Sequence, residues 1–306
     1  MSLKILVIAG PTASGKSRLA LYLAEKYNGV IINADALQLY KYIPILSAQP
    51  SKDDLLQQEH RLYSILEPDK LCSVGSFLKL AINEIENVFN KNKLPIIVGG
   101  SGLYIRSLIY GLSEIPEISE TLREEIRNQY DLVGAESFYQ SLIKADPKVE
   151  GIIRNTDSQR MIRAFEVIKQ TSKSIIEWQK DKIIPYYNQN QFIQITLMPD
   201  RNYLYNNCNV RFKNMIENGV IEEIKVLIKK NIKIDAVKKA VGMIEMIQYL
   251  EGTIDLSELI KLGEQKTRNY AKRQITWFKH QLPEAKRILY ADYNELVNTV
   301  NYINLL

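Results

Sequence analysis

Short apolar runs alternate with amphipathic segments over the first hundred residues of the chain. The runs predict strands and the spacing between them predicts helices, with strands expected at 4–9, 29–33 and 95–98 and helices at 15–27, at 74–90 and from the glycine turn 99–102 through Tyr110. Ser73 stands where an N-cap of the helix at 74–90 belongs. Strands that alternate with helices are typical of a parallel sheet with crossover helices. The pattern therefore predicts an α/β fold for this part of the chain.

The pattern changes after Gly111, where helical segments follow one another without a strand until residue 191. Asp157 and Ser174 stand at N-cap positions, and Glu177 would complete a capping box with Ser174. Helices are expected at 119–130, 134–144, 157–170 and 174–180, then a strand at 191–197 and helices at 200–218, 220–230, 241–250 and 257–279. We therefore expect residues 113–190 to form a helical insertion domain, which would contact RNA, and residues 1–112 and 191–306 to form the core with a helical C-terminal part.

Composition and charge indicate the cellular compartment expected for the protein but do not identify its partner. No apolar stretch approaches the roughly 20 residues that span a bilayer, and no signal peptide precedes the first strand. The two cysteines lie far apart in the sequence and predict no disulfide framework, so the cytoplasm is the expected location. The 40 basic and 35 acidic residues nearly balance, but basic residues crowd into the last third of the chain. That crowding suits either a polyanion-binding surface or a solvated helical one.

A glycine-rich segment between the first expected strand and the first expected helix matches the pattern G-x-x-x-x-G-K-[ST]. It consists of Gly10, Pro11, Thr12, Ala13, Ser14, Gly15, Lys16 and Ser17. In such a loop the backbone N–H groups and the helix N-terminus surround a phosphate, Lys16 supplies a positive charge, and the Ser17 hydroxyl can hold Mg²⁺. The strand before and the helix after it support this interpretation, so the fold class expected is α/β with a P-loop NTPase-like three-layer core and a parallel sheet.

Two more segments follow expected strands and should reach the same edge of the sheet, because the carboxyl ends of parallel strands line the ligand crevice. Asp35 follows the second strand and is a candidate general base, although an aspartate here could also serve as an N-cap or position Mg²⁺. Ser101 lies in a glycine-flanked turn after the third strand. It could bond a leaving oxygen or orient Asp35, but serine is also common in turns for local reasons.

Six segments in this order resemble the bacterial tRNA dimethylallyltransferase family, also called tRNA isopentenyltransferase. They are the phosphate loop, Asp35–Tyr40, Gly99–Tyr104, Asp157–Val167, Arg211-Phe212 and Thr267–Phe278. The resemblance implies that the loop holds the pyrophosphate of dimethylallyl diphosphate and that the acceptor is N6 of the adenosine 3′ of the anticodon. The sequence differs from the family pattern at four places, which concern RNA binding more than chemistry. They are Ala36, Ser101, the segment 46–49 and Met243-Ile244.

The resemblance assigns roles to single residues. Asp35 would accept the N6 proton, Ser101 would stand beside the leaving group, and Lys16 and Arg211 would neutralise pyrophosphate, with Mg²⁺ as cofactor. The partners implied are the donor and the anticodon stem-loop of a tRNA, bound to a monomer. The residues expected to meet tRNA are Asp35, Ala36, Leu37, Gln38, Ser101, Arg123, Gln159, Arg160, Met161, Ile162, Arg163, Lys239, Ala240, Val241, Gly242, Met243, Ile244, Arg268, Lys272, Arg273 and Trp277.

Two other functions use the same loop. A P-loop kinase of a nucleotide or metabolite would explain Lys16 and Asp35 equally well. It gives no reason for the basic and aromatic residues of the last long helix, where Arg273 and Trp277 lie opposite an apolar stripe. An RNA-binding protein that uses nucleotide as a switch would need a second aspartate for Mg²⁺ after an apolar strand, where this chain has Gly99-Gly100.

Overall fold

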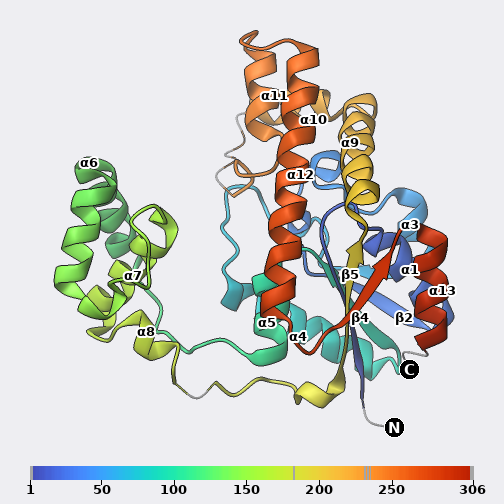
Figure 1. The fold of residues 1–306 in the computed structure, drawn as a ribbon, viewed down its shortest axis with the longest axis horizontal. Coiled ribbons are helices and arrows are strands. Elements are labelled where there is room, and N and C mark those ends of the chain that lie inside the picture. The colour runs from blue at the N-terminus through green and yellow to red at the C-terminus, as the bar shows by residue number, and fades with distance from the viewer. Residues whose placement is uncertain (1–2, 182, 231, 233, 235, 304–306) are drawn as a thin grey trace. The chain divides into compact units, whose positions relative to one another are not determined.

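The computed structural model describes residues 3–181, 183–230, 232, 234 and 236–303, and its elements are labelled in Figure 1. Two compact units are present. One unit consists of residues 1–110 and 185–306, and the other of residues 111–184. The boundaries expected from the sequence lie between residues 112 and 113 and between residues 190 and 191.

The first unit contains a parallel sheet of six strands. They are β1 (Ile5–Ala9), β2 (Gly29–Asn33), β3 (His60–Arg61), β4 (Leu94–Gly99), β5 (Phe192–Pro199) and β6 (Lys286–Tyr290). Their order across the sheet is β3-β2-β4-β1-β5-β6, with Val7 opposite Ile97 on one side of β1 and Gln194 on the other. The prediction of an α/β fold with a parallel sheet is confirmed. The strands β3 and β6 were not predicted, because β3 has two residues and β6 has exposed charges at Lys286 and Arg287.

Helices of this unit lie in the expected places, with three additions. They are α1 (Lys16–Lys26), α2 (Pro44–Ser47), α3 (Lys52–Gln57), α4 (Val74–Asn90), α5 (Gly102–Tyr110), α9 (Arg201–Glu217), α10 (Val220–Lys229), α11 (Met243–Leu250), α12 (Leu256–Gln281) and α13 (Tyr293–Ile303), with short 3-10 turns at Leu37–Leu39 and Gln189–Gln191. Ser73 caps α4 as expected. The helices α2, α3 and α13 were missed. Among the described helices, none is long and apolar enough to cross a bilayer.

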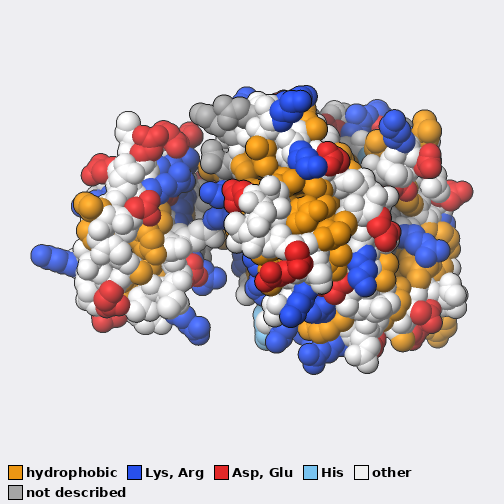
Figure 2. All heavy atoms as spheres, turned by 90° about the horizontal axis from the view of Figure 1, so that it is seen from above, with side chains coloured by type: hydrophobic (Ala, Val, Ile, Leu, Met, Phe, Trp, Pro, Cys, Tyr) orange, Lys and Arg blue, Asp and Glu red, His pale blue; other side chains and the backbone are white. Residues whose placement is uncertain are grey.

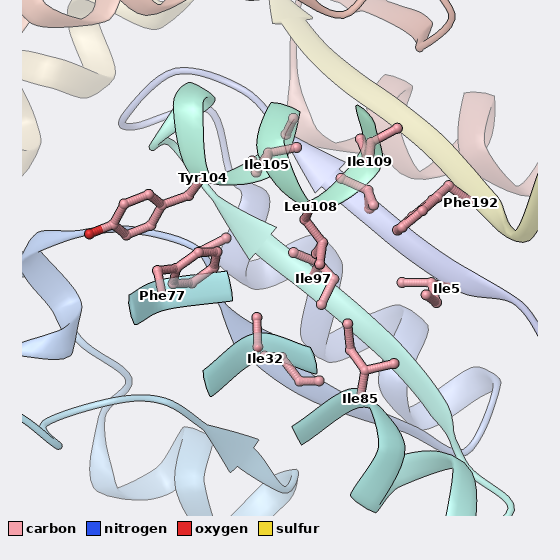
Figure 3. Close-up of a cluster of buried hydrophobic side chains, with 14 of the residues drawn as sticks. Ile5, Ile32, Phe77, Ile85, Ile97, Tyr104, Ile105, Leu108, Ile109 and Phe192 are labelled. Atoms are coloured by element: carbon pink, nitrogen blue, oxygen red, sulfur yellow. The ribbon is translucent and has the colours of Figure 1, made fainter. Parts of the chain in front are cut away.

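Alternate residues of β1 face opposite cores, which explains why the strand reads as a continuous apolar run. Ile5 and Val7 lie in the core under α4 and α5, whereas Leu6 and Ile8 lie in the core under α1 and α13. Figure 3 shows the first of these cores, with side chains from β1, β2, β4, α4, α5 and β5. These two cores fix the strand ends from which the loops of the site extend.

The helices α9 to α12 of the first unit enclose a third core around Phe212. A Cβ atom at Gly263 of α12 would lie 1.9 Å from the Phe212 ring, and one at Gly242 would lie 2.9 Å from it. Glycine at position 263 therefore lets α9 and α12, which run side by side in Figure 1, approach closely, and glycine at position 242 does the same for α9 and the start of α11. Phe212 follows Arg211, so this packing also fixes the helix turn that carries Arg211.

The second unit is helical and has its own core. It contains α6 (Glu120–Ala145), a 3-10 turn at Pro147–Val149, α7 (Ser158–Thr171) and α8 (Ile175–Trp178). Two helices were expected where α6 lies, and the non-helical backbone at Gly134 marks the break between them. Asp157 caps α7, and Ser174 forms the expected capping box with Glu177.

Replacement of Gly263 by alanine should lower the free energy of unfolding by about 1–3 kcal/mol, because the added methyl group would overlap the Phe212 ring. The control is Gly75→Ala in α4, where the nearest atom would lie 3.9 Å from the new Cβ. That change should leave stability equal or raise it by up to about 1 kcal/mol. Urea unfolding of both variants measures the difference, and equal stabilities would contradict the packing described for Phe212.

Candidate functional site

The phosphate loop joins β1 to α1 and has the backbone conformation that an anion cradle needs. Gly15, directly before α1, has φ +82°, in the left-handed region that favours glycine. The Ser14 hydroxyl donates to the Pro11 carbonyl at 2.8 Å, and the Lys16 amine donates to the same oxygen at 2.5 Å. The Lys16 amine is thus folded over the loop, where a bound anion would replace the carbonyl as its partner.

The Asp35 turn is held by the side chain of Asn33, the last residue of β2. The Asn33 amide oxygen accepts from the Asp35 N–H at 2.7 Å, and its nitrogen donates to the carbonyls of Asp35 and Leu62. One carboxylate oxygen of Asp35 accepts from the Leu37 N–H at 3.1 Å, and the residue is half-buried. The carboxylate therefore has a fixed position and remains accessible.

Ser101 connects the glycine turn after β4 to the Asp35 turn. Its hydroxyl oxygen accepts from the Ala36 N–H at 2.8 Å, and its backbone N–H donates to the Ala34 carbonyl at 3.2 Å. A Cβ at Gly99 would lie 2.0 Å from that carbonyl oxygen, so glycine is required for the two turns to meet. Because the hydroxyl acts as an acceptor here, its proton is free for another partner.

Lys16, Asp35 and Arg211 share one electrostatic environment. Burial lowers the pKa of Lys16 to about 8, while Asp35 acts to raise it and Arg211 to lower it. Burial also lowers the pKa of Arg211, and Asp35 opposes that shift. Three of the four residues expected to be catalytic therefore interact electrostatically, and Ser101 bonds the turn that carries Asp35. Two cations that repel each other in this way raise the free energy of the site unless an anion lies between them.

Three residues that the sequence did not single out build the surroundings of these groups. The Tyr290 hydroxyl of β6 donates to the Ser14 carbonyl and supports the phosphate loop from beneath. Burial raises the pKa of Tyr63 and of Tyr270, and the negative charge of Asp35 raises both further. The sequence gives no signal of these roles at the three tyrosines. Asn33, which supports the Asp35 turn, differs from them because it is a polar residue at the end of an apolar strand.

Ser17 is the expected Mg²⁺ ligand and has an exposed position in the first turn of α1. Among the described residues, no group of three or more His, Cys, Asp or Glu side chains could hold a metal ion by itself. A single hydroxyl beside a phosphate site fits Mg²⁺, which keeps several waters and takes ligands from phosphates. The ion would therefore depend on a bound diphosphate.

The second unit carries six of the residues expected to meet tRNA. Arg123, Arg160 and Arg163 each lie 3.3 Å from a carboxylate three residues away on their own helix, and Arg160 is the most exposed of them. Gln159 is exposed and Ile162 is half-buried. Met161 is fully buried in the core of this unit. The expectation of a direct side-chain contact is therefore wrong for Met161, whose apolar side chain stabilises α7 instead.

The segment 239–244 precedes α11 and includes its first residues. It also contains both exposed and buried residues. Lys239 and Ile244 are exposed and Val241 is half-buried. Ala240, Gly242 and Met243 are buried against the core that contains Phe212. The side chains of Ala240 and Met243 do not face solvent, so the expected contact of this segment with tRNA does not extend to these two side chains.

The expected RNA residues of α12 differ in exposure. Lys272 and Arg273 are exposed, whereas Arg268 donates a hydrogen bond to Asn209 of α9. Trp277 is half-buried and covers the glycine turn, because a Cβ at Gly102 would lie 2.2 Å from its ring. The aromatic plane is therefore partly used in packing α12 onto α5.

Basic residues of the last third are partly neutralised. Several form ion pairs on the surface, and Figure 2 shows Lys and Arg side chains beside acidic ones at several places. The shortest pair joins Lys266 to the buried carboxylate of Glu245. Nearby carboxylates thus compensate part of the positive charge that these basic residues carry.

Comparisons with known proteins agree on one family. The model of the IPP transferase family matches residues 38–281. The chain is 42% identical to the tRNA dimethylallyltransferase of Rickettsia bellii over 307 aligned positions, which cover 99% of this chain and 96% of that one.

Solved structures extend the likeness to the fold. The tRNA isopentenylpyrophosphate transferase of Bacillus halodurans is 31% identical, with a TM-score of 0.70 over 98% of this chain and 95% of that one. A eukaryotic dimethylallyltransferase acting on tRNA is 25% identical, with a TM-score of 0.80 over 99% of this chain and 76% of that one.

The lowered pKa of Lys16 predicts a pH dependence of anion binding. The cradle favours an anion when Lys16 is protonated, so affinity for inorganic pyrophosphate should fall as pH rises through about 8. The loss should approach about tenfold per pH unit above that point. Lys16→Arg is the control, because arginine stays charged and the ligand's own titration is common to both proteins. Titration calorimetry at several pH values measures it, and parallel profiles would contradict the assignment.

Proposed function

This chain belongs to the IPP transferase family, and we propose from that premise that it transfers a dimethylallyl group from dimethylallyl diphosphate to a tRNA. The acceptor is N6 of the adenosine 3′ of the anticodon, presented by the anticodon stem-loop. The observation that carries the proposal is the common environment of Lys16, Asp35 and Arg211 at the end of the parallel sheet.

The reaction forms one bond and breaks one. The N6 lone pair attacks C1 of the dimethylallyl group, and the C–O bond to diphosphate breaks with its electron pair staying on the leaving oxygen. The proton that N6 loses passes to the Asp35 carboxylate, which accepts from the Leu37 N–H, while Asn33 holds the backbone of Asp35. A general base of this kind contributes roughly 10²–10⁴-fold.

The second requirement of the reaction is that the negative charge developing on the leaving diphosphate is stabilised. The loop amides, Lys16 and Arg211 lie where that charge would develop, and their burial strengthens the interaction because water screens it less. The free proton of the Ser101 hydroxyl can bond a diphosphate oxygen. We assign Mg²⁺ to Ser17 and the diphosphate, where the ion would neutralise further negative charge.

Exposed and half-buried residues of both units supply the RNA contacts in this proposal. In the first unit these are Lys239, Ile244, Lys272, Arg273 and the exposed edge of Trp277, and in the second they are Arg123, Gln159, Arg160 and Arg163. Basic side chains beside an aromatic ring suit phosphates and an unstacked base. The acceptor adenine must leave the loop stack to reach Asp35, as in other enzymes that modify bases. We expect the protein to act as a monomer.

The kinase interpretation is set aside by the family, since relatives over nearly the full length are named as transferases of a prenyl group to tRNA. The decisive experiment incubates the protein with labelled dimethylallyl diphosphate and unmodified tRNA, in parallel with labelled ATP and candidate small acceptors. Label in the RNA supports the proposal. Label from ATP in a small acceptor, with none in RNA, would restore the kinase.

Replacement of Asp35 by asparagine should lower kcat by about 10²–10⁴-fold, because an amide cannot accept the N6 proton. Affinity for tRNA should change little, since the amide keeps the size of the side chain, and affinity for pyrophosphate should not fall, because the variant removes a negative charge that acts on Lys16 and Arg211. The matched control is Asp69→Asn, an exposed carboxylate that should leave kcat unchanged. Single-turnover transfer measures both, and a normal rate in the Asp35 variant would remove the proposed base.

Ser101 provides a graded test of the hydroxyl. Ser101→Ala should lower kcat by about 10-fold or more, because the Ala36 N–H loses its acceptor and the leaving group loses a donor. Ser101→Thr keeps the hydroxyl and should retain most of the activity. The comparison uses steady-state transfer to tRNA, and equal rates of the alanine and threonine variants would show that the hydroxyl takes no part.

A further inference from the structure

The side chain of Gln274 on α12 joins two loops of the site that are far apart in the sequence. Its amide oxygen accepts from the Thr12 N–H of the phosphate loop at 2.8 Å, and its amide nitrogen donates to the Gly100 carbonyl at 2.9 Å. The residue is 6% exposed. The two partners fix the orientation of the amide, because the reversed orientation would set donor against donor and acceptor against acceptor.

Gly100 makes room for this bridge. A Cβ at Gly100 would lie 2.3 Å from the Gln274 amide nitrogen and 3.4 Å from the nearer carboxylate oxygen of Asp35. The amide of Gln274 and the carboxylate of Asp35 therefore lie against the same glycine. Through Gly100 the bridge also reaches Ser101, whose hydroxyl bonds the Asp35 turn.

We propose that Gln274 is a positioning residue for the transfer reaction, which holds the phosphate loop in register with the turn that carries Ser101 and adjoins Asp35. The inference rests on the proposed function, because only a transfer between a donor on the loop and an acceptor at Asp35 requires that register. A small misplacement of reacting groups can cost about 10²-fold in rate. Gln274 acts through the two loops without touching the reacting atoms.

A second buried polar residue of the same helix shows why the bridge is more than helix packing. Thr267 is also 6% exposed, but its hydroxyl donates to the Gly263 carbonyl of its own helix at 2.7 Å. Loss of that bond affects α12 alone. Gln274 instead satisfies backbone groups of two separate catalytic loops, so its loss should change kinetics as well as stability.

Gln274→Met keeps the approximate volume of the side chain and removes both hydrogen bonds. It should lower kcat by about 10- to 100-fold and weaken binding of inorganic pyrophosphate, while the Kd for tRNA stays within about twofold. Thr267→Val is the matched control and should change thermal stability at most. A loss of stability alone in Gln274→Met, or a loss of tRNA affinity alone, would overturn the proposal.

Gly100→Ala reaches the same bridge from the other side, since its methyl group would displace the Gln274 amide. The φ of Gly100 is not positive, so alanine brings no backbone strain. This variant should reproduce the kinetic effect, and the double variant should lose no more than either single one. Effects that multiply would show that the two residues act independently.

The same experiments separate this inference from the proposed function. If the wild-type protein transfers no prenyl group to tRNA, the proposed function fails. The affinity of wild-type and Gln274→Met protein for pyrophosphate then still decides whether Gln274 orders the phosphate loop, and equal affinities would exclude it. If the wild-type protein is active and Gln274→Met matches it in kcat and in pyrophosphate affinity, only the positioning role fails.

Discussion

The attraction between two half-buried cations, Lys16 and Arg211, and a bound anion is the interaction on which this site depends. Lys16 and Arg211 come from different helices, and burial lowers the pKa of each. Asp35 offsets part of that cost in the free protein. A bound diphosphate would offset more of it, so the site favours an anion. The same arrangement places a carboxylate beside the anion, which a prenyl transfer to an amine requires.

The parallel sheet is what brings these groups to one place. The strands β1, β2 and β4 are adjacent, and each ends in a loop of the site: the phosphate loop, the Asp35 turn and the glycine turn. Backbone bonds between the turns, such as Ser101 N–H to the Ala34 carbonyl, hold the loops together. The helices α9 and α12 contribute Arg211 and Trp277, and the close approach of the two helices depends on Gly263.

Much of this was predictable from the sequence, because apolar runs and cap residues are local signals. The strands β1, β2 and β4, the helix α4 with its cap Ser73, and the phosphate loop all follow from such signals. The edge strand β6 was missed because only alternate positions are buried, and two charged residues begin it. The roles of Tyr290 and Gln274 could not be read from their surroundings in sequence, since their partners lie at least 174 residues away. Burial of Met161 and Met243 in two cores likewise depends on tertiary packing rather than on the local pattern.

A crystal structure with an unreactive thio analogue of dimethylallyl diphosphate and an RNA anticodon stem-loop would test the central claim most directly. The diphosphate should lie on the amides of residues 13–17 between Lys16 and Arg211. The N6 atom of the extruded adenine should lie within hydrogen-bond reach of the Asp35 carboxylate, about 2.6–3.2 Å. A diphosphate bound elsewhere, or an adenine whose N6 faces away from Asp35, would contradict the account.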